Sequence, residues 1–183
     1  MKNPVRKAKD SPGFTLLELM ITLLILGILA SFAIPAFSAW LPGYRLRCAV
    51  RDLYSNMQHA KMTAIKENKK YKLVFNEMGE DSYVLQRPDE TIEKIINFLD
   101  YDPNGNIGYG CGTATKSATT SGGPLPSDFI SYQYNRAVFN SRGTGSPGYV
   151  YLANSKGTAY AVGSWSSGII VIKKWNDSTY SWE

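Results

Sequence analysis

An uncharged apolar run near the N-terminus constrains the fold of this chain more than any other feature. Residues 19–37 carry no formal charge and are mostly leucine, isoleucine, alanine and phenylalanine. As a helix this run is roughly 28 Å long, about the thickness of the hydrocarbon core of a bilayer. Four basic residues precede it, namely Lys2, Arg6, Lys7 and Lys9. Because such residues tend to stay cytoplasmic, the sequence predicts one membrane crossing with the rest of the chain exported.

A cleaved secretory signal and a plain membrane anchor explain this run only in part. The apolar stretch of a signal is usually about 7–15 residues long and ends in a small-residue cleavage site. Here the run is longer, and the small, turn-prone residues 11–13 precede it. A plain anchor gives no reason for Glu18, because a carboxylate at the start of a membrane helix is costly and needs a partner. Without one, the side chain would have to reach the headgroup layer.

Residues 9–18 resemble the prepilin leader of type IV pilins and type II secretion pseudopilins. The stretch reads KDSPG followed by FTLLE. The resemblance implies that a prepilin peptidase cleaves between Gly13 and Phe14 and then N-methylates Phe14. It places Glu18 at the fifth mature residue, where the family carries its acidic residue, and Pro35 where pilins often carry a helix-bending proline.

The chemistry of a new N-terminus gives Glu18 a physical role. Cleavage would create an amine at Phe14, one helical turn from Glu18 and within the apolar zone. An uncompensated buried charge is very unfavourable, whereas an ion pair with good geometry is tolerated. In a helical stack of subunits, Glu18 of one copy could therefore neutralise the Phe14 amine of its neighbour and set the axial register.

The predicted helix continues well beyond the apolar run. We expect a leader at 1–13 and a helix at 14–67, transmembrane at about 17–40 and amphipathic at about 44–67, with a break or bend between these two parts at Pro42-Gly43. The amphipathic part has one apolar stripe with steps of three or four residues. Its members are Leu46, Val50, Leu53, Met57, Ala60 and Ala64.

The remaining residues, 68–183, are predicted to form a β-rich head, exported to the periplasm. Two segments, 71–75 and 82–86, indicate a hairpin, and 92–99 is either a short helix or a strand. A loop at 102–128 is rich in Gly, Ser, Thr, Pro and Asn, and loops of such length are usually functional or mobile. Further strand candidates are 129–134, 148–153, 158–162 and 168–175. An antiparallel sheet packed on the helix, an α+β fold, is therefore expected.

The head resembles that of the GspH/FimT family of minor pseudopilins in residues 138–143, the hairpin after them and the last glycine-led strand. The resemblance implies a pilin fold and a structural, non-enzymatic subunit of a type II secretion pseudopilus or a type IV pilus. It implies other pilins, the inner-membrane assembly platform and the prepilin peptidase as partners. The subunit would span the inner membrane once, with a periplasmic head, until it enters the filament. One chain does not distinguish the two machines.

Nucleic-acid binding is the alternative function that the resemblance raises. In some FimT proteins DNA binding is linked to an arginine after the glycine that begins the last strand, but here two isoleucines follow Gly168. Lys173, Lys174 and Trp175 offer a basic and aromatic substitute, although a solvated strand end explains them more simply. Removing the leader's four basic residues and one aspartate lowers the formal charge from +5 to +2. We therefore expect no nucleic-acid partner.

Catalytic machinery is scarce in this sequence. His59 is the only histidine and lies on the flank of the predicted helix, so triads that need another histidine are excluded. Residues 143–148 match GxGxxG, but a strand candidate follows them where a phosphate-binding helix should begin, so we expect a turn. Glu90 and Glu93 would have to meet in a cleft to serve an anchored enzyme. We therefore predict that the chain is not an enzyme.

Asp100, Asp102 and Asn104 match the first oxygen ligands of an EF-hand calcium loop. A glycine stands at the sixth position and an isoleucine at the eighth, as in such loops. Cys111 stands at the twelfth, so calcium would need a carboxylate from elsewhere in the chain. A plain turn cluster is the alternative.

Cys48 and Cys111 would meet an oxidising compartment if the head is exported. Cys48 lies in the predicted helix and Cys111 in a distant loop, so the sequence does not bring them within bonding range. Both a disulfide and two free thiols remain open.

Overall fold

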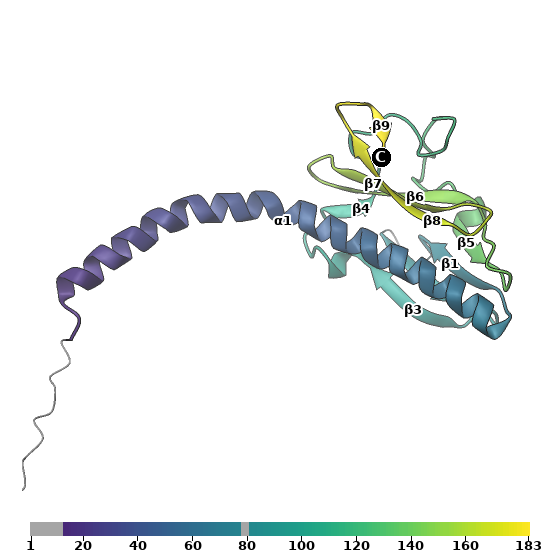
Figure 1. Ribbon diagram of the computed structural model, residues 1–183, viewed down its shortest axis with the longest axis horizontal. Coiled ribbons are helices and arrows are strands. Elements are labelled where there is room, and N and C mark those ends of the chain that lie inside the picture. Colours follow the sequence, from purple (N-terminus) through teal and green to yellow (C-terminus); the bar gives the residue numbers. More distant parts are fainter. Residues whose placement is uncertain (1–12, 78–80) are drawn as a thin grey trace, which may run out of the picture. The chain divides into compact units, whose positions relative to one another are not determined.

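The computed structural model describes residues 13–77 and 81–183 of the chain (Figure 1). The chain divides into two compact units, Met1–Ala39 and Trp40–Glu183, and each is considered by itself. Helix α1, Leu16–Glu67, begins in the first unit and ends in the second. Of the predicted leader at 1–13, only Gly13 is among the described residues.

The second unit contains nine strands and two short 3₁₀ helices, η1 and η2, within the described residues. Their bounds are β1 Tyr71–Phe75, β2 Ser82–Gln86, β3 Ile92–Asn97, η1 Phe98–Asp100, β4 Ile107–Tyr109, η2 Gln133–Asn135, β5 Arg136–Phe139, β6 Gly148–Asn154, β7 Ala159–Ser164, β8 Ile170–Asn176 and β9 Ser181–Trp182.

These strands form two antiparallel sheets. One has the order β3-β2-β1-β5 and the other β4-β6-β7-β8-β9. The predicted hairpin of residues 71–75 and 82–86 is confirmed as β1 and β2, paired from Lys72–Gln86 to Phe75–Tyr83. The segment with two predicted alternatives is strand β3, followed directly by η1. The predicted α+β class is therefore confirmed.

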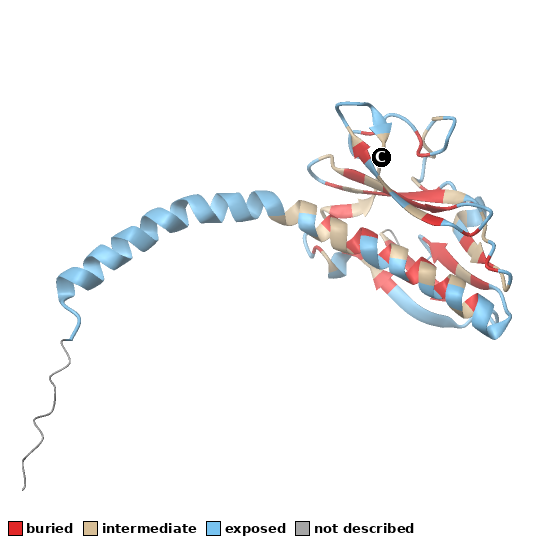
Figure 2. Cartoon of the chain, in the orientation of Figure 1, coloured by how far each residue is buried: buried red, intermediate tan, exposed pale blue. Residues whose placement is uncertain are grey.

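The core of the head lies along the predicted apolar stripe of α1. All six stripe residues are buried, together with Ala49 and Asn56 (Figure 2). The six stripe residues and Ala49 pack in one cluster with residues of both sheets, among them Leu73, Leu85, Val150 and Val162. α1 continues through Pro42 and Gly43, where the sequence predicted a bend or break. Apolar burial on both sheets thus holds the second half of α1 in the head.

The strand candidate at 129–134 is wrong. Only an isolated bridge joins Ile130 to Val150, and η2 begins at Gln133. The backbones of Phe129, Tyr134 and Asn135 have φ angles of 59°, 55° and 54°. Such left-handed conformations do not extend a strand. The next strand is β5.

The segment predicted as a loop at 102–128 is more ordered than its composition indicates. It contains β4, and Ala118 packs against Tyr149, Tyr151 and Ala161 on the sheet. Tyr151 Oη accepts a 2.8 Å bond from the Ala118 N–H, and Lys173 Nζ donates a 2.8 Å bond to the Ala118 carbonyl. Burial raises the pKa of the Tyr151 hydroxyl, so it stays neutral in this contact. The segment is thus fixed to the sheet at its middle.

Candidate functional site

The first turn of α1 holds Glu18 in a reciprocal pair of hydrogen bonds with Thr15. The backbone N–H and the hydroxyl of Thr15 each donate to Glu18 Oε2 at 2.9 Å. The Glu18 N–H donates to Thr15 Oγ1 at 3.2 Å. This is a capping box, which satisfies backbone donors that the first helical turn leaves open. Thr15 is a residue that the sequence reasoning missed, although the Thr-x-x-Glu spacing is a recognisable signal.

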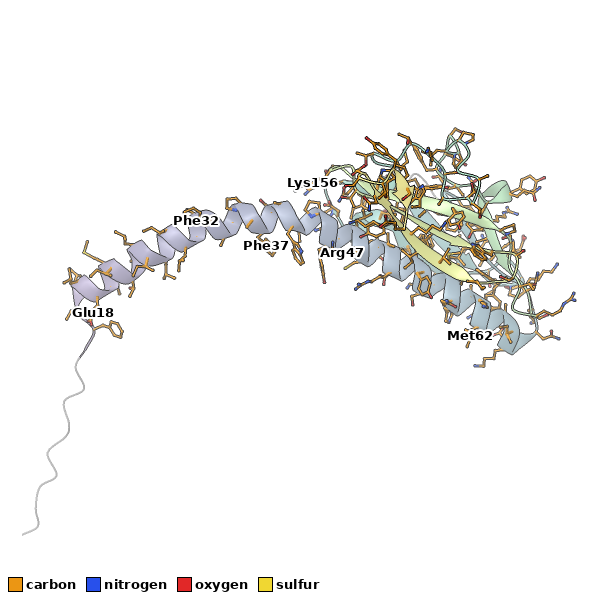
Figure 3. All side chains as sticks on the ribbon, turned by 45° about the horizontal axis from the view of Figure 1, so that its top comes forward. Glu18, Phe32, Phe37, Arg47, Met62 and Lys156 are labelled. Carbon is orange, nitrogen blue, oxygen red and sulfur yellow. The ribbon has the colours of Figure 1, made fainter. Side chains whose placement is uncertain are left out.

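The first half of α1 exposes a continuous apolar surface. From Phe14 to Phe37, every leucine, isoleucine, methionine and phenylalanine is at least half exposed. The side chains of Phe32 and Phe37, like Glu18, project from the helix in Figure 3. α1 is long and apolar enough to cross a membrane, and no residue in its most apolar stretch of 18 residues is buried. An apolar surface of this extent needs lipid or other protein to cover it.

An aromatic pair follows the apolar segment. The rings of Trp40 and Tyr44 stack with centroids 4.8 Å apart. Both side chains are about half exposed, and Arg45 is the first charged residue after Glu18. Tryptophan and tyrosine are enriched where a membrane helix meets water. The pair is therefore suited to the end of a membrane span.

Asp102 ties the predicted calcium loop to α1. Arg45 Nη1 donates to Asp102 Oδ1 at 2.8 Å, and the Asn104 N–H donates to the same oxygen at 3.1 Å. Asn106 Nδ2 donates to Asp102 Oδ2 at 3.1 Å. Asp102 is buried, whereas Asp100 and Asn104 are exposed. In the described part of the chain, no group of three or more His, Cys, Asp or Glu side chains could hold a metal ion.

Calcium titration of the melting temperature tests the predicted site. Arg45 already forms an ion pair with Asp102, so we expect no rise in the melting temperature at millimolar calcium. A bound ion would stabilise the folded state and raise it. A rise that the Asp102→Asn variant loses would instead establish the calcium site.

The two cysteines are free thiols, and both are partly buried. Cys48 lies on α1. Cys111 follows β4 and packs against Ala114, Ala159 and Trp175. A disulfide between them stays one of the two alternatives that the sequence offers.

Most residues that raised the rival functions have structural partners, whereas Lys174 is exposed. Trp175 is buried, and its indole Nε1 donates to Asp177 Oδ1 at 2.9 Å, so its ring offers no open face for a base. Lys173 Nζ donates a hydrogen bond to the Ala118 carbonyl. The carboxylates proposed for a cleft each pair with a cation, Glu90 with Lys72 at 3.0 Å and Glu93 with Arg87 at 3.1 Å. His59 is largely exposed, with Nδ1 3.9 Å from Glu93 Oε1.

Comparison with known proteins decides the family. Residues 9–34 match the model of the prokaryotic N-terminal methylation motif. Residues 49–168, more than half of the chain, match the family model described as type II transport protein GspH. The chain belongs to the GspH family. Two relatives, both named type IV major fimbrial protein FimA, come from Dichelobacter nodosus, one of them from strain VCS1703A. Each is 34% identical over 118 residues, which cover 56% of this chain and 68% of the relative. No solved structure gives a match.

Membership of the GspH family confirms the resemblance drawn from the sequence. The methylation-motif match contains Gly13, Phe14 and Glu18, and the GspH match begins at Ala49, a buried residue of α1, and ends at Gly168. A long helix with an apolar stretch, packed on antiparallel sheets, is the pilin-like α+β fold that was expected. The cleavage site and the roles of these residues stay predictions.

Proposed function

We propose that this GspH-family chain is a non-enzymatic filament subunit, either a minor pseudopilin or a minor pilin. The observation that carries the proposal is the division of one helix into two kinds of surface. Its first half is exposed and apolar, with Glu18 as the only charged residue between Phe14 and Tyr44. Its second half lies in the core of the head. A helix of this kind can anchor a head to a membrane and later pack against other subunits.

In this proposal the prepilin peptidase removes residues 1–13 and N-methylates Phe14. The match to the methylation motif supports this step. The mature chain then crosses the inner membrane once, at about 17–40, with its amphipathic part at about 44–67 and its head at 68–183 in the periplasm. The basic residues of the leader and the Trp40–Tyr44 pair support that orientation and that boundary.

Assembly would move the apolar helix from lipid into a bundle of other pilins, aided by the inner-membrane assembly platform. In the single chain Glu18 accepts two hydrogen bonds from Thr15. In the filament its carboxylate would pair with the Phe14 amine of a neighbour, because either charge buried without a partner is strongly unfavourable. The description of the family supports a secretion pseudopilus, and the names of the relatives support a type IV pilus.

Shearing of filaments from cells tests this function. A tagged chain is produced in cells that carry a secretion pseudopilus or a type IV pilus, with and without the prepilin peptidase. We expect the chain in the sheared filament fraction only when the peptidase is present, because the leader keeps charge at the end of the apolar helix. The Gly13→Val variant, altered at the cleavage site, should stay in the membrane fraction. Absence of the wild-type chain from both kinds of filament would contradict the proposal.

A further inference from the structure

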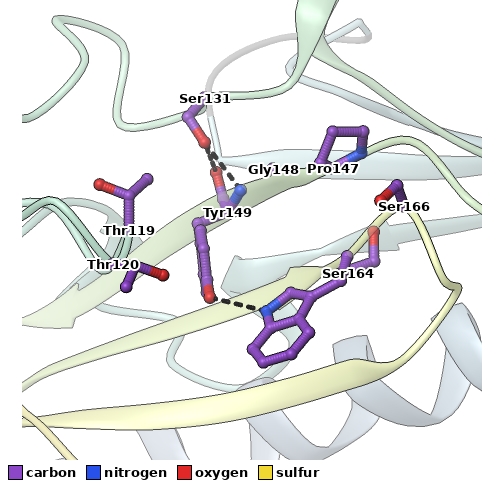
Figure 4. Close-up of a pocket in the computed structure, with 9 residues that line it drawn as sticks. Thr119, Thr120, Ser131, Pro147, Gly148, Tyr149, Ser164 and Ser166 are labelled. Carbon is purple, nitrogen blue, oxygen red and sulfur yellow. Dashed lines mark hydrogen bonds between the residues drawn. The ribbon is translucent and has the colours of Figure 1, made fainter.

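The head carries an open groove without charged groups over the start of β6 and the end of β7. Its volume is about 490 Å³, within the range of roughly 300–1,000 Å³ that is usual for ligand pockets. Its lining combines a tryptophan, a tyrosine and a proline with the hydroxyl groups of three serines and two threonines. In Figure 4, Thr119 and Thr120 lie on one side of Tyr149, and Pro147, Ser164 and Ser166 lie on the other. None of the functions discussed above uses this groove.

Trp165 is a fixed aromatic surface in the groove. Its side chain is 48% exposed, which is unusual for so large an apolar ring. Its backbone is held in the turn between β7 and β8, where the Trp165 N–H donates to the Ile169 carbonyl at 2.9 Å and the Gly168 N–H donates to the Trp165 carbonyl at 2.8 Å. Its indole Nε1 donates to Tyr149 Oη at 3.2 Å. A ring held in this way loses little freedom when a ligand covers it.

Three hydroxyl groups remain available to a ligand. Tyr149 Oη accepts from Trp165 and donates its own proton to no residue that the structure describes. The hydroxyls of Thr120 and Ser166 make no hydrogen bond within residues 13–77 and 81–183. Each of the three can both donate and accept.

The wall formed by β6 has no free strand edge. Ser131 satisfies both backbone polar groups of Tyr149. The Ser131 N–H donates to the Tyr149 carbonyl at 2.8 Å, and the Tyr149 N–H donates to Ser131 Oγ at 2.7 Å. A peptide that binds by adding a strand needs unpaired backbone groups, so this wall does not favour it. The lining contains no Lys or Arg, which usually bind phosphates and carboxylates. The nearby Lys173 Nζ lies 5.4 Å from the centre of the Tyr149 ring, but it donates to the Ala118 carbonyl. The groove therefore disfavours anionic ligands.

We propose that this groove binds a neutral saccharide. A sugar ring has an apolar C–H face that can lie on the negative face of the Trp165 indole. Its hydroxyl groups both donate and accept hydrogen bonds, as do Tyr149, Thr120 and Ser166. A neutral sugar also brings no charge into an uncharged groove, so it incurs no penalty for burying an unpaired ion. The proposal concerns the head alone and does not depend on filament assembly.

Ligand-observed NMR on the full chain in a sugar-free zwitterionic detergent tests this proposal. The probes are maltohexaose, cellohexaose and fully N-acetylated chitohexaose, all neutral, at millimolar concentration. We expect saturation transfer to at least one of them, with affinity lowered about tenfold or more in Trp165→Ala, because the stacking surface is lost. Tyr149→Phe, which removes only a hydroxyl, should also weaken binding. Tyr180→Ala, which removes an exposed aromatic outside the groove, should bind like the wild type.

Each alternative outcome overturns the proposal. It is wrong if the folded wild-type chain binds none of the three oligosaccharides, or if both groove variants, shown to be folded by their melting curves, bind like the wild type. It is also wrong if an uncharged peptide receives saturation transfer from the chain and none of the sugars does.

Discussion

Glu18→Gln is expected to exclude the subunit from filaments while it remains in the membrane. Glutamine keeps an oxygen that can accept the Thr15 hydrogen bonds, so the capping box survives. It removes the charge, so the Phe14 amine of a neighbour would be buried without a partner. Because breaking a buried ion pair is strongly unfavourable, incorporation should fall to about one tenth of the wild-type level or lower. The amount of chain in the sheared filament fraction, relative to the membrane fraction, measures the effect.

Thr15→Ala is the matched control for this variant. It removes the hydroxyl of the capping box and leaves the carboxylate of Glu18 in place. If Glu18 acts through its charge, Thr15→Ala should enter filaments far better than Glu18→Gln. Incorporation of Glu18→Gln at the wild-type level would show that Glu18 serves only to cap the helix.

Gly168→Ala is expected to destabilise the head strongly. The Gly168 backbone has a φ of +76°, and an added Cβ would lie 1.8 Å from the Gly143 carbonyl oxygen. The left-handed backbone alone costs a non-glycine residue about 1–2 kcal/mol. The collision is with backbone, so one of two packed turns must move, and the Lys61 Nζ bond to the Gly168 carbonyl at 2.8 Å would move with it. We expect a total loss of at least about 3 kcal/mol, comparable with overpacking of a core.

Gly122→Ala separates the backbone effect from the collision. Gly122 has a similar φ of +60°, but the nearest atom to an added Cβ is the Cδ of the Lys116 side chain at 4.0 Å. At about 2–4 °C per kcal/mol for a domain of this size, the melting temperature should fall by roughly 2–8 °C in Gly122→Ala and by at least about 6 °C in Gly168→Ala. Equal decreases in the two variants would mean that the turns of Gly143 and Gly168 separate easily.

Local patterns made the helix predictable from the sequence. The uncharged run identifies the apolar first half of α1, and the 3–4 spacing from Leu46 to Ala64 identifies the buried face of its second half. Helical geometry alone determines which side chains share a face. The hairpin of β1 and β2 is likewise local. The error at 129–134 arose because the apolar residues there suggest a strand, whereas Phe129 and Tyr134 take left-handed backbone conformations that sequence patterns do not reveal.

Contacts between distant residues were not predictable. The Ala118 peptide is bound from two strands of the sheet, by Tyr151 and Lys173, although its own segment reads as a polar loop. Local spacing offers Asp102 either a calcium ion or a plain turn, and does not reveal its ion pair with Arg45, which is far away in the sequence. The groove that contains Trp165 combines four separate segments. Only the folded chain brings such groups together.

Mass spectrometry of the protein purified from its native membrane tests the central claim most directly. If the chain is a processed filament subunit, the mature protein should begin at Phe14, with one methyl group on its new amine. An intact start at Met1 would contradict the account, because Glu18 would then have no neighbouring amine to neutralise. Trimming beyond Trp40 would contradict it as well, because the head would be released without its anchor.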